Sequence, residues 1–226
     1  MIKIISSMAT RLLLVDLAAQ WQAASSQYVS VESVGGLDAA ERVQAGEAFD
    51  GAVLGLGAID KLIASGHLVA GSRVDLASSN VAVAIKAGSP LPDISTEAAL
   101  RSAVSAAHTI GYSTGPSGVA VIELFERWGL SESLKSKIVQ TPPGVPVGSL
   151  VARDEVALGF QQLSELMHLD GITVVGSLPQ AVAITTVFSA GLCSLSTQPG
   201  LAVKFFAFMA GGQADAAKVR HGMTAI

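Results

Sequence analysis

Residues 2–21 read IKIISSMATRLLLVDLAAQW, and this stretch decides the fold class. It opens with Ile2–Ile5, a β-branched run typical of a short strand, and continues through a polar turn at 6–10. Apolar residues then recur at helical spacing between Leu12 and Trp21. The stretch therefore predicts a strand, a turn and a helix, which is the unit from which α/β sheets are built.

The same alternation continues along the rest of the chain. Strands are expected at 28–34, 50–54, 80–86, 109–112, 137–140, 157–160, 172–175 and 181–188. Helices are expected at 38–46, 57–65, from 95 onward, and at 119–128, 147–153 and 199–210. Because the crossovers are short, we predict an α/β fold with parallel strands flanked by helices.

The composition narrows the class of protein. Half of the 226 residues are hydrophobic and 14% are charged, which excludes a disordered chain and supplies a substantial core. The 14 Lys and Arg residues are scattered and the formal net charge is −4, so no nucleic-acid partner is expected. No run of about 20 apolar residues occurs, so we expect no insertion into a membrane.

Residue types that hold metals or cofactors are isolated in the sequence. Cys193 is the single cysteine, which excludes an internal disulfide and a multi-thiol metal site. The histidines show no paired spacing, and the acidic residues are spread singly. The four histidines are His67, His108, His168 and His221. We therefore expect no metal and no cofactor.

The first residues lead directly into the first expected strand. A secretory signal would place a basic start, an apolar region and a small-residue cleavage site before the domain, whereas Met1–Ile5 leads directly into the strand and Asp16 interrupts the apolar residues at 11–19. As given, the chain is expected in the cytoplasm. A periplasmic protein whose signal peptide had been removed would look the same.

Candidate ligand-binding residues follow the strands, where helices begin. Free backbone N–H groups and the helix dipole favour an anion at such a place. Ser6, Ser7 and Met8 are candidates in the first turn, where the serines could instead be ordinary helix caps. Gly35 and Gly36 could form a backbone nest for an anion, or simply a turn that needs positive φ.

The strongest candidate is the segment STGPSG at 113–118. Ser113, Thr114 and Ser117 offer three hydroxyl groups ahead of a helix, and Pro116 presets the entry into that helix. The pattern suits a phosphate or carboxylate group but lacks the lysine of a Walker loop. The alternative is an ordinary solvent-exposed turn.

Gln161 and Gln162 follow another expected strand. A side-chain amide can donate to a carboxylate and accept from a hydroxyl group. One of the two is expected to face the ligand, because neighbouring strand residues alternate; the alternative is a polar loop. An enzyme would also need a base, for which only Tyr112 and Ser117 can be named. The catalytic residues therefore stay unknown at this point.

The order of these elements resembles the type 2 periplasmic solute-binding fold, specifically the molybdate-binding proteins of import systems. The resemblance covers almost the whole chain. It rests on the first strand followed by SSMA, on RVQAGEAFDGAVLG at 42–55, on PSG at 116–118 and on VARDEVALGFQQLSEL at 151–166. Around GFQQLSEL the chain looks closer to a subgroup similar to aconitate isomerase.

The resemblance implies two hinged lobes, each a mostly parallel sheet flanked by helices. Lobe one is expected at 1–82 plus 184–226 and lobe two at 83–183, with the ligand cleft between them at the carboxyl ends of strands. Molybdate-binding proteins present serines that correspond here to Ala9 and to Gly35-Gly36. This difference argues against a tetrahedral oxyanion site and for a roomier one.

Two functions follow from these residues together with the resemblance. The first is binding of a small anion, a carboxylate or comparable oxyanion, with an ABC permease as partner if the protein is exported. The second is isomerisation of an unsaturated polycarboxylate, similar to aconitate isomerase. A cytoplasmic ligand sensor is a third, weaker alternative. The missing base favours pure binding, whereas the missing signal argues against transport.

Overall fold

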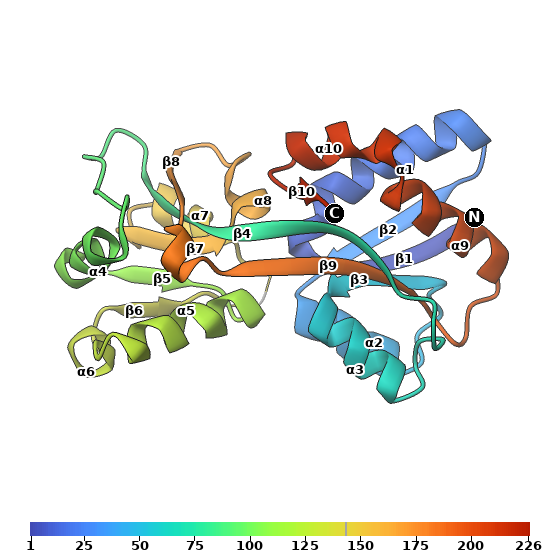
Figure 1. Ribbon diagram of the computed structural model, residues 1–226, viewed down its shortest axis with the longest axis horizontal. Helices are drawn as coiled ribbons and strands as arrows, with labels where there is room; N and C mark the ends of the chain where they lie inside the picture. The colour runs from blue at the N-terminus through green and yellow to red at the C-terminus, as the bar shows by residue number, and fades with distance from the viewer. Residues whose placement is uncertain (143) are drawn as a thin grey trace. The chain divides into compact units, whose positions relative to one another are not determined.

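The computed structural model describes residues 1–142 and 144–226 and divides the chain into two compact units (Figure 1). Unit 1 comprises Met1–Ser79 and Thr186–Ile226, and unit 2 comprises Asn80–Thr185. The chain therefore passes between the units twice, within or at the end of the strands β4 (Val74–Lys86) and β9 (Thr185–Leu192). The sequence places these two passages near residues 82 and 184.

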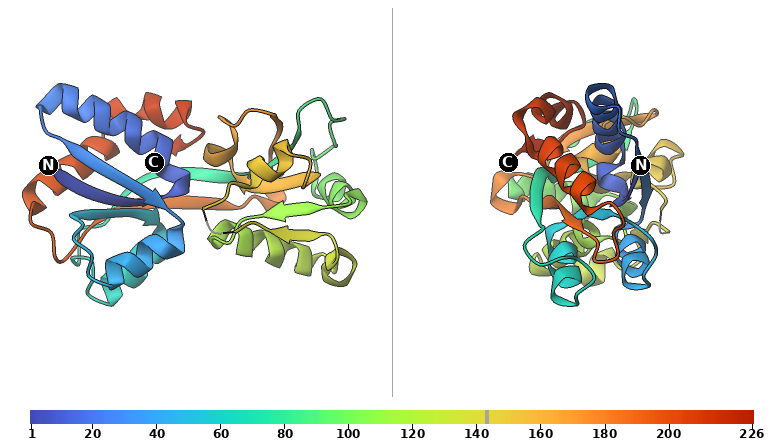
Figure 2. Two further views of the ribbon diagram at one scale, coloured as in Figure 1. Left: turned by 180° about the vertical axis from the view of Figure 1, so that it is seen from behind. Right: turned by 90° about the vertical axis from the view of Figure 1, so that its right-hand side faces the viewer.

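Unit 1 is a sheet with helices on both faces (Figure 2). Its strands follow the order β2-β1-β3-β9-β4, and β10 pairs with β4. The central strand β1 (Ile2–Ser7) runs parallel to β2 (Val29–Val34) and β3 (Gly51–Gly55), whereas β9 is antiparallel to β3. The other elements of this unit are η1 (Met8–Thr10), α1 (Arg11–Ser25), α2 (Gly36–Gln44), α3 (Leu56–Ala64), α9 (Pro199–Ala210), η3 (Gly212–Ala214), α10 (Asp215–Arg220) and β10 (Thr224–Ala225).

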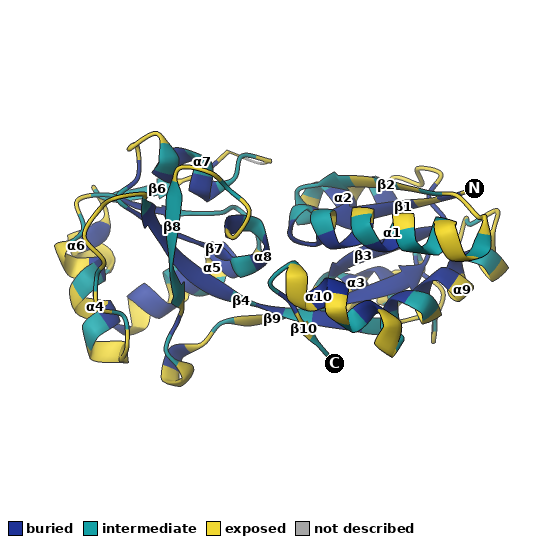
Figure 3. Ribbon diagram, turned by 90° about the horizontal axis from the view of Figure 1, so that it is seen from above, coloured by how far each residue is buried: buried dark blue, intermediate teal, exposed yellow. Residues whose placement is uncertain are grey.

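Alternation along β1 divides the core of unit 1 between the two faces of the sheet. Ile2 and Ile4 pack with α1, α9 and α10, whereas Ile5 packs with α2 and α3. Figure 3 shows β3 and much of β4 buried and the outer sides of the helices exposed. Each fully buried side chain of this size contributes about 1.5–3 kcal/mol, so both faces are needed to hold β1 in register.

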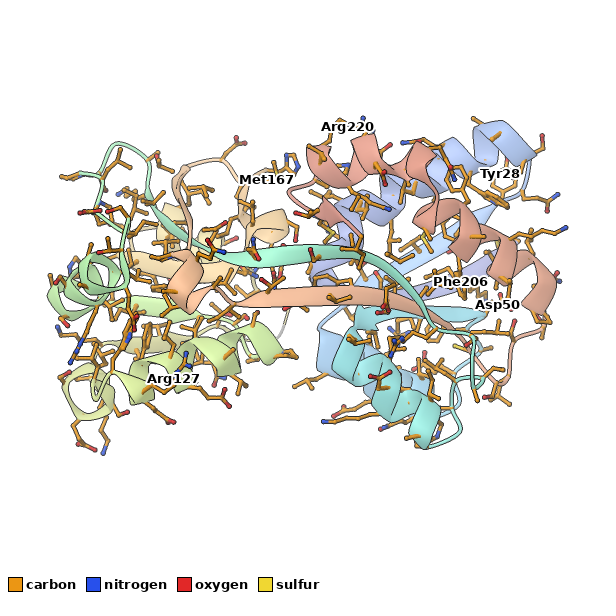
Figure 4. All side chains as sticks on the ribbon, in the orientation of Figure 1. Tyr28, Asp50, Arg127, Met167, Phe206 and Arg220 are labelled. Atoms are coloured by element: carbon orange, nitrogen blue, oxygen red, sulfur yellow. The ribbon has the colours of Figure 1, made fainter. Side chains whose placement is uncertain are left out.

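One glycine sets how closely α9 packs on this sheet. A Cβ atom at Gly51 would overlap the ring of Phe206, a buried side chain of α9 (Figure 4). The neighbouring Asp50 is buried as well and ties the start of α9 to β1. Its Oδ2 accepts from Lys3 N at 2.9 Å, and its Oδ1 accepts from Gln198 N at 3.1 Å.

Unit 2 repeats the plan with a smaller sheet. Its strands follow the order β4-β7-β5-β6, and β8 pairs with β4. The strand β5 (Ile110–Tyr112) runs parallel to β6 (Ile138–Gln140) and β7 (Leu158–Gln162), whereas β4 is antiparallel to β7 and to β8 (Ile172–Ser177). The other elements are α4 (Glu97–Ala106), α5 (Pro116–Arg127), α6 (Ser131–Leu134), α7 (Val147–Ala152), α8 (Leu163–Leu166) and η2 (Gln180–Val182).

The core of unit 2 is also split by its sheet. Phe160 of β7 packs edge-on against Phe125 of α5, with ring centroids 5.5 Å apart. On the opposite face Val147 and Val151 of α7 form a separate buried cluster. Phe160 therefore points toward α5, and the next residue of β7 points toward α7.

The predicted α/β architecture is confirmed, with several differences in detail. The strand β4 extends over 74–86 although only 80–86 was expected, because Ala77 and Ser78 near its start pair with β10. Residues 180–182 form a 3-10 turn, so β9 begins at Thr185 rather than at 181. Antiparallel pairs made by β4 and β9 also join the expected parallel ones. No helix in the described part of the chain is both long and apolar enough to cross a membrane.

Candidate functional site

In unit 1 three parallel strands end side by side, and a helical segment begins at each end. Ser7 at the end of β1 is paired with Val34 of β2, and Ser6 is paired with Val53 of β3. Residues that follow these strands therefore leave the same edge of the sheet. Met8 of η1 and Gly35 ahead of α2 follow β1 and β2, and Gly55, the last residue of β3, stands directly ahead of α3.

The two helices at this edge begin without side-chain caps. Gly35 is the N-cap of α2 and Gly55 is the N-cap of α3, and neither can offer a side-chain acceptor. The first N–H groups of a helix have no partner inside it, and they carry the positive end of the helix dipole. The φ of Gly35 is −54°, so it is not the positive-φ turn that was the alternative prediction.

Ser7 adds a hydroxyl group to these amides. Ser7 is 8% exposed, and its buried Oγ has no hydrogen-bond partner among the described residues. A Cβ atom placed on Gly36 would lie 3.7 Å from Ser7 Cβ, so the hydroxyl-bearing carbon lies beside the first residue of α2. A buried hydroxyl group without a partner is costly, and an acceptor bound at this edge would satisfy it.

The other residues predicted at this edge have different surroundings. The Ser6 hydroxyl group is fully buried and already pairs with Ser33 Oγ at 2.7 Å. Met8 is half-buried in η1. Asp38 in the first turn of α2 brings its carboxylate close to Gly35, which partly offsets the positive potential there. The structure therefore brings Ser7 and Gly36 together and directs the Ser6 hydroxyl group elsewhere.

Unit 2 has a similar edge at the ends of β5, β6 and β7. Tyr112 is in register with Gln140 and Phe160, so the residues that follow these strands leave together. The segment predicted from the sequence as the strongest candidate follows β5. Gly115 is the N-cap of α5, again without a side-chain cap, and Pro116 occupies the first turn.

Two of the three predicted hydroxyl groups meet in this turn. Ser113 Oγ and Ser117 Oγ lie 3.5 Å apart, with Ser117 buried in the first turn of α5. Thr114 lies half-buried between them in the chain. A Cβ atom at Gly118 would overlap the carbonyl oxygen of Ser113, so this close turn requires glycine. The segment is a compact turn that presents hydroxyl groups at the amino end of a twelve-residue helix.

The two glutamines at the end of β7 are both buried. Gln161 Oε1 accepts a hydrogen bond from Val147 N at 2.8 Å, and Gln161 Nε2 donates to Glu165 Oε2 at 2.6 Å. Gln161 therefore links β7 to the start of α7 and to α8. Gln162 is the N-cap residue of α8.

Glu165 is a feature that sequence reasoning missed. Burial raises the pKa of its carboxyl group to about 7, against the opposing hydrogen bond from Gln161. Gly55 was missed as well, because a single glycine after a strand gives a weaker signal than the Gly35-Gly36 pair. Tyr112, named earlier as a weak candidate base, lies beside Gly118 at the end of β5.

No group of three or more His, Cys, Asp or Glu side chains in the described part of the chain could hold a metal ion. The chemistry available at the two edges is that of hydroxyl groups, backbone amides, side-chain amides and the carboxyl groups of Asp38 and Glu165. Hydroxyl groups and helix amino ends suit an anion, and the carboxyl group of Glu165 suits proton transfer.

Comparison with known proteins places the chain among solute-binding proteins. The model of a family described as bacterial extracellular solute-binding protein matches residues 2–224. The periplasmic molybdate-binding protein of Azotobacter vinelandii superposes with a TM-score of 0.84 at 20% identity, over 99% of each chain. The sulfate-binding protein SubI of Mycobacterium tuberculosis gives a TM-score of 0.81 at 12% identity, over 100% of this chain and 86% of that one.

A curated relative is more similar in sequence. An aconitate isomerase from a Pseudomonas species is 41% identical over 162 residues. The match spans 71% of this chain but only 61% of that protein. The chain thus covers less than two thirds of the length of this relative.

Proposed function

The chain belongs to the family of bacterial extracellular solute-binding proteins, and from this premise we propose that it binds a small anion, a carboxylate or a comparable oxyanion. The observation that carries the proposal is the buried, unpartnered hydroxyl group of Ser7 beside Gly36 at the uncapped start of α2. An anion supplies the acceptor that both the hydroxyl group and the amides lack.

The proposed ligand-binding residues are those named from the sequence, with unequal roles. In unit 1 we assign contact to Ser7, Gly35 and Gly36, with Gly55 added. In unit 2 we assign contact to the Ser113–Ser117 turn. The names of similar structures support an anion, since they describe proteins that bind molybdate, tungstate and sulfate.

Gln161 has a supporting role in this proposal. Both ends of its side-chain amide already form hydrogen bonds inside unit 2, so it stabilises the start of α7.

A carboxylate ligand fits better than a tetrahedral oxyanion, because glycines stand at Gly35 and Gly36 and leave room for a larger anion.

The family description also bears on where the protein works. We infer that it acts outside the cytoplasmic membrane, in place of the cytoplasm suggested by its first residues, because the family is described as extracellular. Its partner there would be the permease of an ABC import system.

A second candidate function is isomerisation of an unsaturated polycarboxylate. It is favoured by the 41% identity to an aconitate isomerase and by a carboxyl group, Glu165, whose pKa suits proton transfer. Anion binding is the first step of this function too.

The binding proposal is tested by a thermal-shift screen of the whole chain. The ligands are trans-aconitate, citrate, succinate, sulfate and molybdate, with glucose and ribose as neutral controls. A polycarboxylate at 100 times its dissociation constant is expected to raise the free energy of unfolding by about 2.7 kcal/mol. Stabilisation by a neutral sugar, with none by any anion, would contradict the proposal.

A further inference from the structure

Glu165 is a carboxyl group that the binding proposal does not use. It lies in α8 directly after β7 and is half-buried. Among the described residues, its hydrogen-bond partner is the neutral amide of Gln161. The neighbouring elements α7, β7 and β8 contain no ionisable residue, and Lys86 at the end of β4 pairs with Asp154 instead. In the described part of the chain, burial and the hydrogen bond from Gln161 are therefore the influences on the pKa of this carboxyl group.

The orientation of Gln161 is determined at its other end. The backbone N–H of Val147 can only donate, so the atom of Gln161 that it meets at 2.8 Å must be the oxygen, Oε1. Nε2 is then left to face Glu165, and the carboxyl oxygen at 2.6 Å must accept. A base held by a neighbouring hydrogen-bond donor, which is itself anchored, is the arrangement that acid–base chemistry needs.

The raised pKa distinguishes Glu165 from the other described carboxyl groups. Those whose pKa departs from its ordinary value otherwise all depart downward: Asp16, Glu32, Glu47, Asp50, Asp93 and Glu155. A carboxyl group with a pKa of about 7 is present in both protonation forms near neutral pH. It can therefore both take and return a proton.

Glu165 also lies at the edge of unit 2 that carries the hydroxyl turn. β5 and β7 are neighbouring parallel strands with Tyr112 in register with Phe160. Neighbouring strands are about 4.8 Å apart. The helices α5 and α8, which follow β5 and β7 in the chain, therefore begin at the same edge of the sheet. The Ser113–Ser117 turn and Glu165 therefore follow two neighbouring strands that end at one edge of the sheet.

We propose that Glu165 is the acid–base group that shifts a double bond in an unsaturated polycarboxylate, and this inference rests on the isomerase alternative above. The Glu165 carboxylate takes a proton from the carbon next to the double bond, and the C–H electron pair becomes the new double bond. The electron pair of the old double bond then takes the proton back from Glu165 at its far carbon. One C–H bond breaks and one forms, so no oxidant, reductant or co-reactant is needed.

Other parts of the same edge have matching roles. Negative charge that moves onto the carboxylate of the substrate during the shift would be stabilised by the hydroxyl groups of Ser113 and Ser117 and by the amino end of α5. Gln161 is a positioning residue, because it acts on Glu165 rather than on the substrate.

The test is proton exchange in heavy water, followed by nuclear magnetic resonance, with trans-aconitate as the probe and the whole chain as the protein. The variants are E165Q, which keeps the size of the side chain but cannot take a proton, and E126Q, a matched change on the exposed face of α5. E165Q is expected to lower the exchange rate at least about 100-fold, whereas E126Q leaves it unchanged. The affinity for trans-aconitate, measured by calorimetry, should be no weaker in E165Q than in the wild type.

Each other outcome has a distinct meaning. If the wild-type chain binds trans-aconitate without exchange, the inference and the isomerase alternative fail while anion binding stands. If exchange in E165Q stays within about threefold of wild type, Glu165 is not the acid–base group although the isomerase alternative survives. Should E165Q fail to fold, E165D replaces it: the inference then predicts slower exchange with a shifted pH profile, and an unchanged rate and profile would overturn it.

Discussion

At the scale of single residues, a buried hydroxyl group without a partner costs free energy in the empty protein. Ser7 Oγ is such a group, so S7A is expected to leave the stability of the unliganded protein unchanged or to raise it by about 1 kcal/mol. If the same hydroxyl group donates to an anion, S7A should weaken binding by about 1.5–3 kcal/mol. Urea unfolding and calorimetry with trans-aconitate measure the two effects separately.

Ser6 supplies the matched control for this prediction. Its hydroxyl group already pairs with Ser33, so S6A should lower stability by about 1 kcal/mol and should affect binding less than S7A does. A loss of stability in S7A with unchanged affinity would show that the Ser7 hydroxyl group is structural.

Asp50 is a buried residue whose negative charge contributes to the stability of unit 1. Burial raises the pKa of its carboxyl group, but hydrogen bonds from Lys3, Ser196, Gln198 and Thr197 outweigh burial and hold the pKa below its usual value. A lowered pKa in the folded state means that the stabilisation is present above the ordinary pKa of about 3.9 and is lost as the pH falls below it.

D50N is therefore expected to lower the free energy of unfolding by about 2–3 kcal/mol at pH 7, and by progressively less toward pH 3. Denaturant unfolding at several pH values measures this difference. The matched change D170N alters an exposed aspartate and should have an effect below about 0.5 kcal/mol throughout. A difference for D50N that does not change with pH would contradict the assigned role of the charge.

The sequence predicted some of these residues and missed others for a physical reason. Ser7 and Ser117 were predictable, because a hydroxyl residue after a β-branched run and before a helical pattern lies at a strand end in any α/β sheet. Glu165 was not, because its raised pKa depends on burial and on Gln161, whose orientation is fixed by Val147, 14 positions away from it. No local pattern in the sequence records that contact.

At the scale of elements, the turn between β5 and α5 depends on the missing side chain of Gly118. In G118A the new methyl group would overlap the Ser113 carbonyl oxygen, so the first turn of α5 must move. We expect a loss of more than about 2 kcal/mol in stability together with weaker anion binding, because Ser113 and Ser117 are displaced as well.

G57A is the matched control for this change. Gly57 lies in the second position of α3, and a Cβ atom there meets nothing within 4 Å. Alanine favours a helix over glycine by up to about 1 kcal/mol, so G57A is expected to be neutral or stabilising. Denaturant unfolding measures the free energy of unfolding of both variants. Equal changes in G118A and G57A would contradict the close approach between Gly118 and the Ser113 carbonyl oxygen.

Element boundaries show where periodicity alone is insufficient. Most strands and helices were expected where they occur, because alternation and capping residues are local signals. The first half of β4 was missed, since VDLASS at 74–79 is rich in polar residues and pairs with β10, which lies far along the chain. The 3-10 turn η2 was expected to be part of a strand, because its apolar residues are compatible with either a strand or a turn.

At the scale of the whole molecule, the two units have three structural features in common. Each has parallel strands that end together, a glycine N-cap without a side-chain acceptor, and serine hydroxyl groups beside it. That one ligand engages both units and draws them together stays a prediction from the sequence. Small-angle scattering with and without a saturating polycarboxylate would measure it, as a smaller radius of gyration in the liganded protein.

The central claim is that the negative charge of the ligand is what this protein recognises. The most direct measurement is calorimetric titration of the wild-type chain with trans-aconitate and with its trimethyl ester, which keeps the carbon skeleton and removes the charge. Saturable binding of the trianion, with affinity for the ester at least about 100-fold weaker, is the predicted result. Equal binding of both compounds, or binding of the ester alone, would contradict it.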